Sequence, residues 1–317
     1  MVTPGICLAC RIRPSVSIVV VCALPASKGL NVEVFSVDET GIEAVIAPFL
    51  RPQSDFLSLL ARTLKKLEKK KEKAPIDRNP GYVEAVYDLA WDDTFWKHFQ
   101  DGGGDTACLW GPRQFVMGSM GIKRAYLLLI YRIIEKLAPR TVLEVGSGNG
   151  LNLLLLANRF PDIRFAGIEL SANGVSSAKA MAVAPLPSYL ERFSPQPLLT
   201  REAPNVTFEQ ASAVQLPYDD NSFDLVLTVQ ALEQMEAVRS QALSEIARVA
   251  RRNTVMVEPF KEWNEDGLRR LYIESAGYFR GAICELPQYR LRPIATRADY
   301  PMKITIGVPL VVASKEL

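Results

Sequence analysis

The segment T-V-L-E-V-G-S-G-N-G, residues 141–150, reads as a buried strand that runs into a glycine loop. Val142, Leu143 and Val145 supply the apolar run that is typical of a strand buried on both faces of a parallel sheet. The alternating glycines after it permit a sharp turn and a close approach of the backbone to a ligand. Residues 151–160 are apolar and predict a helix whose first N–H groups face the loop. The segment therefore predicts a nucleotide-type binding site.

The spacing of the glycines narrows the kind of nucleotide. A dinucleotide fingerprint needs its third glycine three positions after the second, where this chain has Leu151, and this disfavours a dehydrogenase. A phosphate-binding G-x-x-x-x-G-K-[ST] loop is also absent from the segment, because no lysine follows these glycines. Two acidic residues accompany the glycine loop and help to identify the kind of site: Glu144 in the strand and Glu169 at the end of the next apolar run.

This pattern resembles the first motif, E/D-x-G-x-G-x-G, of the class I S-adenosylmethionine-dependent methyltransferases. The resemblance extends from about Gly121 to the end of the chain, and strands and helices alternate along it. It implies an α/β fold, Rossmann-like and doubly wound, with a mostly parallel seven-stranded sheet and an antiparallel last strand, plus an N-terminal extension. Apolar runs predict the later strands at 163–170, 205–209, 223–229, 254–257, 284–294 and 304–313.

The resemblance implies S-adenosyl-L-methionine as the cofactor. Glu169, at a strand's carboxyl end, is placed to accept hydrogen bonds from ribose hydroxyls. Where the family often has G-D-A, this chain has Ala211-Ser212-Ala213, so a neutral hydroxyl replaces the acid. The cofactor-binding candidates are Glu144, Gly146, Ser147, Gly148, Asn149, Gly150, Glu169, Leu170, Ser212, Ala213 and Gln230.

The chemistry implied is in-line displacement at the methyl group of a sulfonium. The protein mainly positions the reactants and excludes water, so no metal is expected, and a base is needed only for an acceptor that must lose a proton. The catalytic candidates are His98, the sole histidine, together with Glu233 and Glu258 at strand ends. Gln234 stands where relatives often have a histidine.

Composition limits the other classes of function. The chain has 317 residues, 48% of them hydrophobic, and a net charge of +2, which argues against a dedicated nucleic-acid binder. Five cysteines give no disulfide framework, and the Cys7–Cys10 pair has no second pair to complete a zinc site, so a cytoplasmic location is expected. The apolar run at 16–24 is too short to span a membrane, and with 31–37 it predicts a pair of strands.

The chain divides at a Pro- and Gly-containing break into an extension at 1–80 and a methyltransferase domain at 81–317. The extension holds a predicted helix with Ser54 as N-cap and a leucine-rich face, and its end at 62–73 carries a net charge of +5. This end is either a solvated surface, which we favour, or a contact for an anionic carrier or membrane surface. In the domain, the aromatic residues of 88–99 with Trp110 and Phe115 are expected as core or as a cap on the site. Gly118–Gly121 is predicted to be a flexible break before a helix at 122–137, and the Pro-rich 184–204 is a candidate lid.

The sequence thus predicts a methyltransferase acting on a small-molecule or carrier-linked acceptor. The alternative is a methyltransferase-like binding or regulatory protein without turnover, favoured by Ser212 and Gln234. Neither the methylated atom nor the oligomeric state follows from these residues.

Overall fold

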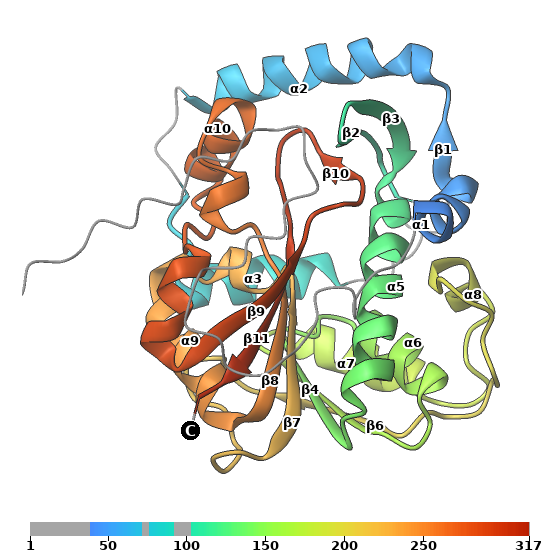
Figure 1. Cartoon of the computed structure of the whole chain (residues 1–317), viewed down its shortest axis with the longest axis vertical. Helices are drawn as coiled ribbons and strands as arrows, with labels where there is room; N and C mark the ends of the chain where they lie inside the picture. Colours follow the sequence, from blue (N-terminus) through green and yellow to red (C-terminus); the bar gives the residue numbers. More distant parts are fainter. Residues whose placement is uncertain (1–38, 72–75, 92–102, 317) are drawn as a thin grey trace, which may run out of the picture.

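The computed structural model describes residues 39–71, 76–91 and 103–316 (Figure 1). Within them, a seven-stranded main sheet has the order β6-β5-β4-β7-β8-β11-β9. Strands β4 to β8 are parallel, whereas β11 pairs antiparallel with both β8 and β9. The Rossmann-like sheet with an antiparallel last strand is confirmed. Its strands are β4 (Thr141–Val145), β5 (Arg164–Glu169), β6 (Val206–Gln210), β7 (Phe223–Val229), β8 (Ala250–Val257), β9 (Leu291–Arg297) and β11 (Leu310–Lys315).

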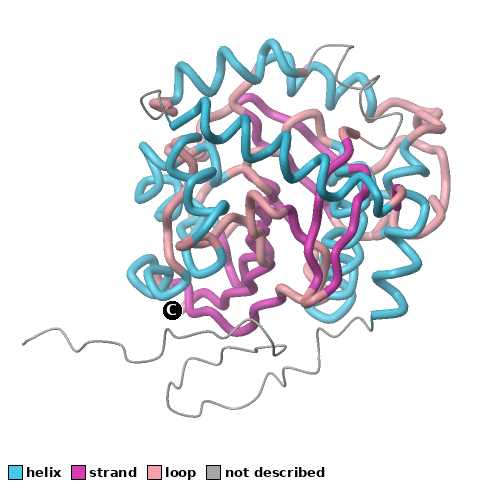
Figure 2. Tube along the Cα trace, turned by 90° about the horizontal axis from the view of Figure 1, so that it is seen from above, coloured by secondary structure: helices cyan, strands magenta, loops and turns pink. Residues whose placement is uncertain are grey.

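The central strand is β4, which lies between β5 and β7 with every residue buried. Its side chains alternate between two cores: Val142 belongs to one, and Leu143 and Val145 to the other. Helices cover both faces of the sheet (Figure 2). One core includes residues of α5 (Ser119–Leu137), α6 (Leu151–Arg159) and α7 (Ala172–Met181), and the other includes residues of α9 (Arg239–Val249).

A second, smaller sheet has the order β1-β3-β2-β10 and joins distant parts of the chain. The hairpin β2–β3 (Asp105–Trp110 and Arg113–Gly118) forms its middle, β1 (Leu50–Arg51) pairs with β3, and β10 (Met302–Lys303) pairs with β2. The described part of the extension therefore shares a sheet with an early and a late segment of the predicted domain at 81–317, while the division at residue 80 remains a prediction. Trp110 and Phe115 lie on this hairpin and belong to or pack against the core, as expected. The predicted break at Gly118–Gly121 is wrong, because Gly118 ends β3 and α5 begins at the next residue.

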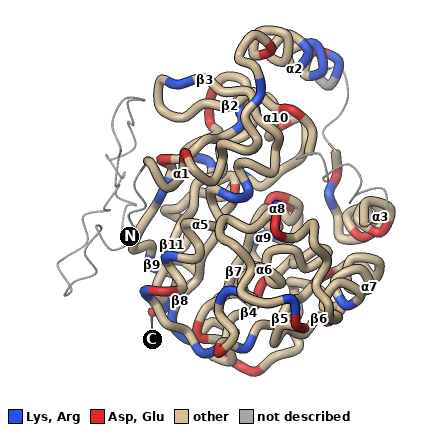
Figure 3. The backbone as a smooth tube through the Cα atoms, turned by 90° about the vertical axis from the view of Figure 1, so that its right-hand side faces the viewer, with Lys and Arg blue, Asp and Glu red and all other residues tan. Residues whose placement is uncertain are grey.

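Helix α2 (Phe56–Lys71) crosses the small sheet, and α1 (Glu39–Ile46) packs against α5. Phe56 and Leu67 of α2 are buried, but Leu57 and Leu64 are 73% and 39% exposed, so the leucine-rich face is only partly core. Ser54 lies inside a short 3₁₀ helix, Gln53–Asp55, rather than directly before α2. Lys and Arg residues concentrate toward the end of α2 (Figure 3).

The Pro-rich segment 184–204 packs on the outside of α5 and α6. Its short helix α8 (Leu190–Phe193) is buried at both ends, and Asn158 of α6 donates a hydrogen bond to the Thr200 carbonyl at 2.7 Å. None of its residues lines the cavity described below, so the prediction of a lid is wrong.

Helices α3 and α10 pack against different parts of the molecule. Helix α3 (Pro80–Ala90) lies over the carboxyl ends of the strands, and α10 (Gly267–Ala276) packs against α2. The strand expected at 284–294 begins only at Leu291, because Ile283–Tyr289 forms a 3₁₀ helix.

Candidate functional site

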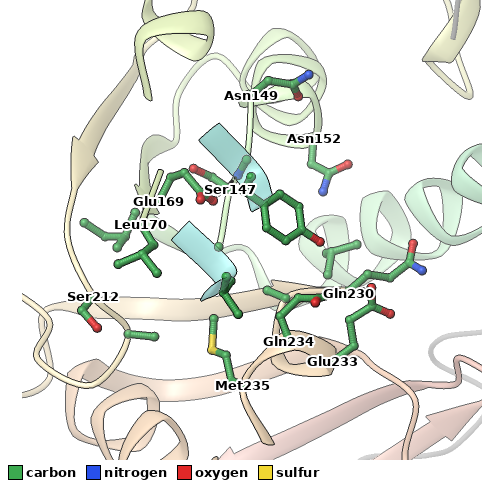
Figure 4. Close-up of a pocket in the computed structure, with 18 of the residues that line it drawn as sticks. Ser147, Asn149, Asn152, Glu169, Leu170, Ser212, Gln230, Glu233, Gln234 and Met235 are labelled. Carbon is green, nitrogen blue, oxygen red and sulfur yellow. Dashed lines mark hydrogen bonds between the residues drawn. The ribbon is translucent and has the colours of Figure 1, made fainter. Parts of the chain in front are cut away.

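A cavity of about 290 Å³ lies at the carboxyl ends of β4, β5, β6 and β7 (Figure 4). This edge is where open α/β sheets bind their ligands. Ten of the residues that the sequence predicted line it: Gly146, Ser147, Gly148, Asn149, Glu169, Leu170, Ser212, Ala213, Gln230 and Glu233. Glu144, Gly150 and Glu258 do not line it, and His98 lies outside the described residues.

Glycine is needed in this loop both for its backbone conformation and because neighbouring side chains leave no room for a Cβ. Gly146 and Gly148 have φ of 76° and 55°, a region that suits glycine. A Cβ on Gly146 would lie 2.4 Å from the Cβ of Ala231, and one on Gly148 would lie 2.6 Å from the Trp91 ring. Glycine is therefore required at both positions, and Trp91 lies directly over the loop.

Glu169 closes β5 and reaches the loop from the neighbouring strand. Its Oε2 accepts a hydrogen bond from the Gly148 N–H at 2.8 Å, and its Oε1 accepts one from the Ser171 N–H at 3.0 Å. Burial raises the pKa of this carboxyl, and the two N–H donors oppose that shift. A carboxylate offers roughly four acceptor sites, so capacity remains for two hydroxyl donors.

Several polar atoms around the loop are buried without a hydrogen-bond partner among the described residues. They are Ser147 Oγ, Asn149 Nδ2, Asn152 Oδ1 and Glu144 Oε2, and the first three belong to residues that line the cavity. Buried polar groups are rarely left unpaired in native proteins. The unpaired set together with Glu169 fits a polar ligand such as the nucleoside and amino-acid parts of S-adenosylmethionine.

Glu144 lies behind this wall and is fully buried. It accepts a hydrogen bond from Asn152 Nδ2 at 2.6 Å, so it positions a residue that lines the cavity. Burial raises the pKa of Glu144 to about 7, and burial lowers the pKa of nearby Lys123 to about 8. Lys123 also lines the cavity and was missed from the sequence; its only signal is a Lys-Arg pair inside the apolar run of α5.

The ends of β7 and β8 contribute two acids with different roles: Glu233 follows β7, and Glu258 follows β8. Glu258 is fully buried, and its two oxygens accept hydrogen bonds from the N–H groups of Ala231 (3.0 Å) and Glu233 (3.1 Å). It therefore holds the turn after β7 in place. Glu233 itself lines the cavity, and burial raises its pKa to about 7. Its Oε1 accepts a hydrogen bond from Gln234 Nε2 at 2.9 Å, while no hydrogen bond to its Oε2 is found among the described residues.

Helix α3 covers the cavity and is attached on both sides of it. Its Asp88 accepts hydrogen bonds from Ser171 Oγ at 2.6 Å and from the Asn173 N–H at 3.2 Å, at the start of α7. Just before the helix, Arg78 donates to Gln234 Oε1 and to the Ala276 carbonyl. The sequence suggested a capping role for this region but did not identify Arg78, Tyr87 or Tyr126, which also line the cavity.

At the far side, the end of β6 supplies Ala211 to Val214 to the cavity wall. Ser212 Oγ accepts only a long hydrogen bond, 3.4 Å, from the Val214 N–H. Its hydroxyl therefore retains both its proton and acceptor capacity for a ligand.

Sheet order, glycine loop and strand-end acid together define a class I S-adenosylmethionine-dependent methyltransferase domain. Residues 143–257 match the methyltransferase-domain family, so this part of the chain is a class I methyltransferase domain, whose cofactor is S-adenosyl-L-methionine.

Two curated relatives share part of this domain. Ajmaline N-methyltransferase of Rauvolfia serpentina is 29% identical over 163 residues, which cover 50% of this chain and 50% of that protein. Demethylmenaquinone methyltransferase of Porphyromonas gingivalis is 27% identical over 133 residues, or 41% of this chain and 47% of that protein. The chain spans about half the length of the curated relatives it matches.

Among solved structures, the [4+2]-cyclase SpnF superposes with a TM-score of 0.50 at 19% identity, covering 77% of this chain and 97% of that one. At this identity the likeness concerns the fold. None of the helices in the described ranges combines the length and apolar composition needed to cross a bilayer.

Proposed function

We propose that this protein transfers a methyl group from S-adenosylmethionine to a small-molecule or carrier-linked acceptor. The observation that carries the proposal is that Glu169 and Glu233 line one cavity at the carboxyl edge of the sheet. The Glu169 carboxyl accepts a hydrogen bond from the glycine loop, and burial raises the pKa of the Glu233 carboxyl to about 7. The cavity therefore offers separate groups for holding a cofactor and for handling an acceptor proton.

In this proposal, each residue has a defined task. Glu169 accepts hydrogen bonds from the ribose hydroxyls, Ser212 contacts the base, and the unpaired polar atoms of Ser147 and Asn149 contact the remaining polar groups. When bound, S-adenosylmethionine supplies an electrophilic methyl group on a positively charged sulfur. Glu233 takes the proton that the acceptor releases, for which a pKa of about 7 is suitable. Helix α3 with Trp91 excludes water from the cavity.

The test combines binding and turnover. Isothermal titration with S-adenosylmethionine and S-adenosylhomocysteine measures cofactor affinity, and release of S-adenosylhomocysteine across a panel of acceptors measures methyl transfer. The proposal would be refuted if neither S-adenosylmethionine nor S-adenosylhomocysteine binds.

A methyltransferase-like binding protein is the second candidate. Gln234, at a position where a histidine is common in the family, favours it. The Gln234 side chain is hydrogen-bonded to Arg78 and to Glu233. Cofactor binding without turnover on any acceptor of a broad panel would support it.

A further inference from the structure

A second cavity, of about 170 Å³, adjoins the first. The two cavities share Lys123, Tyr126 and Gln230 as lining residues. The rest of the second cavity comes from the start of α5 and from the connection between β9 and β11, which contains β10. Apart from the three shared residues, its wall is therefore separate from the loops that hold the cofactor candidates.

Most of this wall is apolar. Met120, Ile122, Met302, Ile306 and Val308 line it. The hydroxyl of Tyr300, which also lines it, already donates a hydrogen bond to the Val308 carbonyl. Binding of a ligand in this cavity would be stabilised mainly by the burial of apolar surface.

The charged groups in the wall are of one sign. Lys123 and Lys303 line the cavity, and no carboxyl group does so within the described residues. The positive charge of Lys123 is opposed by the neighbouring Glu144 carboxyl. The Lys303 ammonium makes no ion pair in the described part of the chain, and the carboxyl of Glu233 attracts it only over a longer distance. Lys303 is thus the cation left to bind a ligand.

We propose that the second cavity binds the methyl acceptor, and that this acceptor is a small apolar molecule carrying a carboxylate that pairs with Lys303. The inference rests on the proposed function, because the shared residues place the second cavity beside the cofactor cavity. An ammonium-bearing ligand in the same place would meet two lysines and no acid in the cavity wall, and like charges at close range are unfavourable. A neutral ligand would leave Lys303 desolvated without a partner.

The experiment measures charge preference in the full-length protein saturated with S-adenosylhomocysteine. Benzoate, phenylacetate and octanoate are titrated beside their primary amides and the corresponding primary amines, with affinities from calorimetry or ligand-observed NMR. We expect each carboxylate to bind at least about tenfold more tightly than its amide, because a charge-assisted hydrogen bond contributes roughly 1.5 kcal/mol or more.

Variants then assign the preference to Lys303. Lys303→Met should remove it, Lys303→Glu should transfer it to the amines, and Lys136→Met, at an exposed lysine in the last turn of α5, should leave it unchanged. Circular dichroism establishes folding, and Lys303→Gln replaces Lys303→Met if that variant is unfolded.

Two results would overturn the inference: equal affinity for carboxylates and amides in the wild type, or a preference that persists in the folded Lys303 variants. The preliminary titration with S-adenosylhomocysteine separates the two proposals. Failure of that compound to bind refutes the proposed function, and titration of the probes into the cofactor-free protein still tests the charge preference of the second cavity.

Discussion

Replacing Glu169 with alanine should weaken cofactor binding and destabilise the glycine loop by separable amounts. The carboxylate accepts hydrogen bonds from the N–H groups of Gly148 and Ser171, and its remaining acceptor sites face the cavity. Loss of hydrogen bonds from the ribose hydroxyls to a charged group should cost about 1.5–3 kcal/mol, or about 10- to 150-fold in Kd. The two N–H groups left without an acceptor should lower the free energy of unfolding by about 1–2 kcal/mol, the lower part of the usual range, because cavity water can reach them.

Calorimetric titration of S-adenosylmethionine measures the first effect, and urea denaturation without ligand measures the second. Glu209→Ala is the matched control, since it removes an exposed carboxyl from the adjacent strand β6. It should change neither quantity by more than about 0.5 kcal/mol. A folded Glu169→Ala protein whose Kd stays within about twofold of the wild type would show that the ribose binds elsewhere.

Other variants test the remaining parts of the site. Glu233→Gln should lower kcat by about 100-fold, with cofactor affinity unchanged in calorimetry. Because the ionised carboxylate acts as the base, the wild-type rate should rise with pH through about 7, and this rise should be absent in the variant. Gly148→Val should displace Trp91 and abolish S-adenosylmethionine binding in calorimetry while circular dichroism remains unchanged, because the added Cβ would lie 2.6 Å from the indole. Burial raises the pKa of Glu144 from 4.5 to about 7, so the folded state holds a proton that the unfolded state has lost. The free energy of unfolding should therefore fall as pH rises between these values, and Glu144→Gln should make the dependence shallower in urea denaturation. Changing Lys65, Lys66 and Lys69 together to glutamine should alter stability and turnover little if this exposed face is only solvated. If the wild type binds anionic liposomes in a salt-dependent way and the variant does not, these lysines instead bind the membrane surface.

The central β4–α6 unit and the role of Glu169 as a cavity residue were predictable because their signals are local. A strand buried on both faces needs a continuous apolar run, and residues 141–145 supply one. The position of Glu169 follows from the parallel register of β4 and β5, which brings the end of one strand beside the loop of the other.

Features that depend on distant partners were not predictable. β1 and β10 have two residues each, and their pairing with the β2–β3 hairpin carries no local signal. The length and proline content of 184–204 suggested a lid, but the burial of Leu186, Leu190 and Phe193 directs that segment to the outer surface of α5 and α6. Lys123 and Arg124 are adjacent basic residues on an otherwise apolar helix. Only the tertiary structure shows that Lys123 is the one that lines the cavity.

The pairing of β10 with β2 also has a kinetic consequence. Lys303 pairs with Cys108, which lies 195 residues earlier in the chain (303 − 108), so this contact closes a very long loop for only two strand residues. Such non-local pairings form slowly, and short ones open readily. The wall of the second cavity should therefore form late during refolding and exchange its amide hydrogens well before β4 and β7 do. An acceptor bound beside β10 would slow that exchange, so deuterium uptake at residues 302–308 would report occupancy without any need to observe turnover.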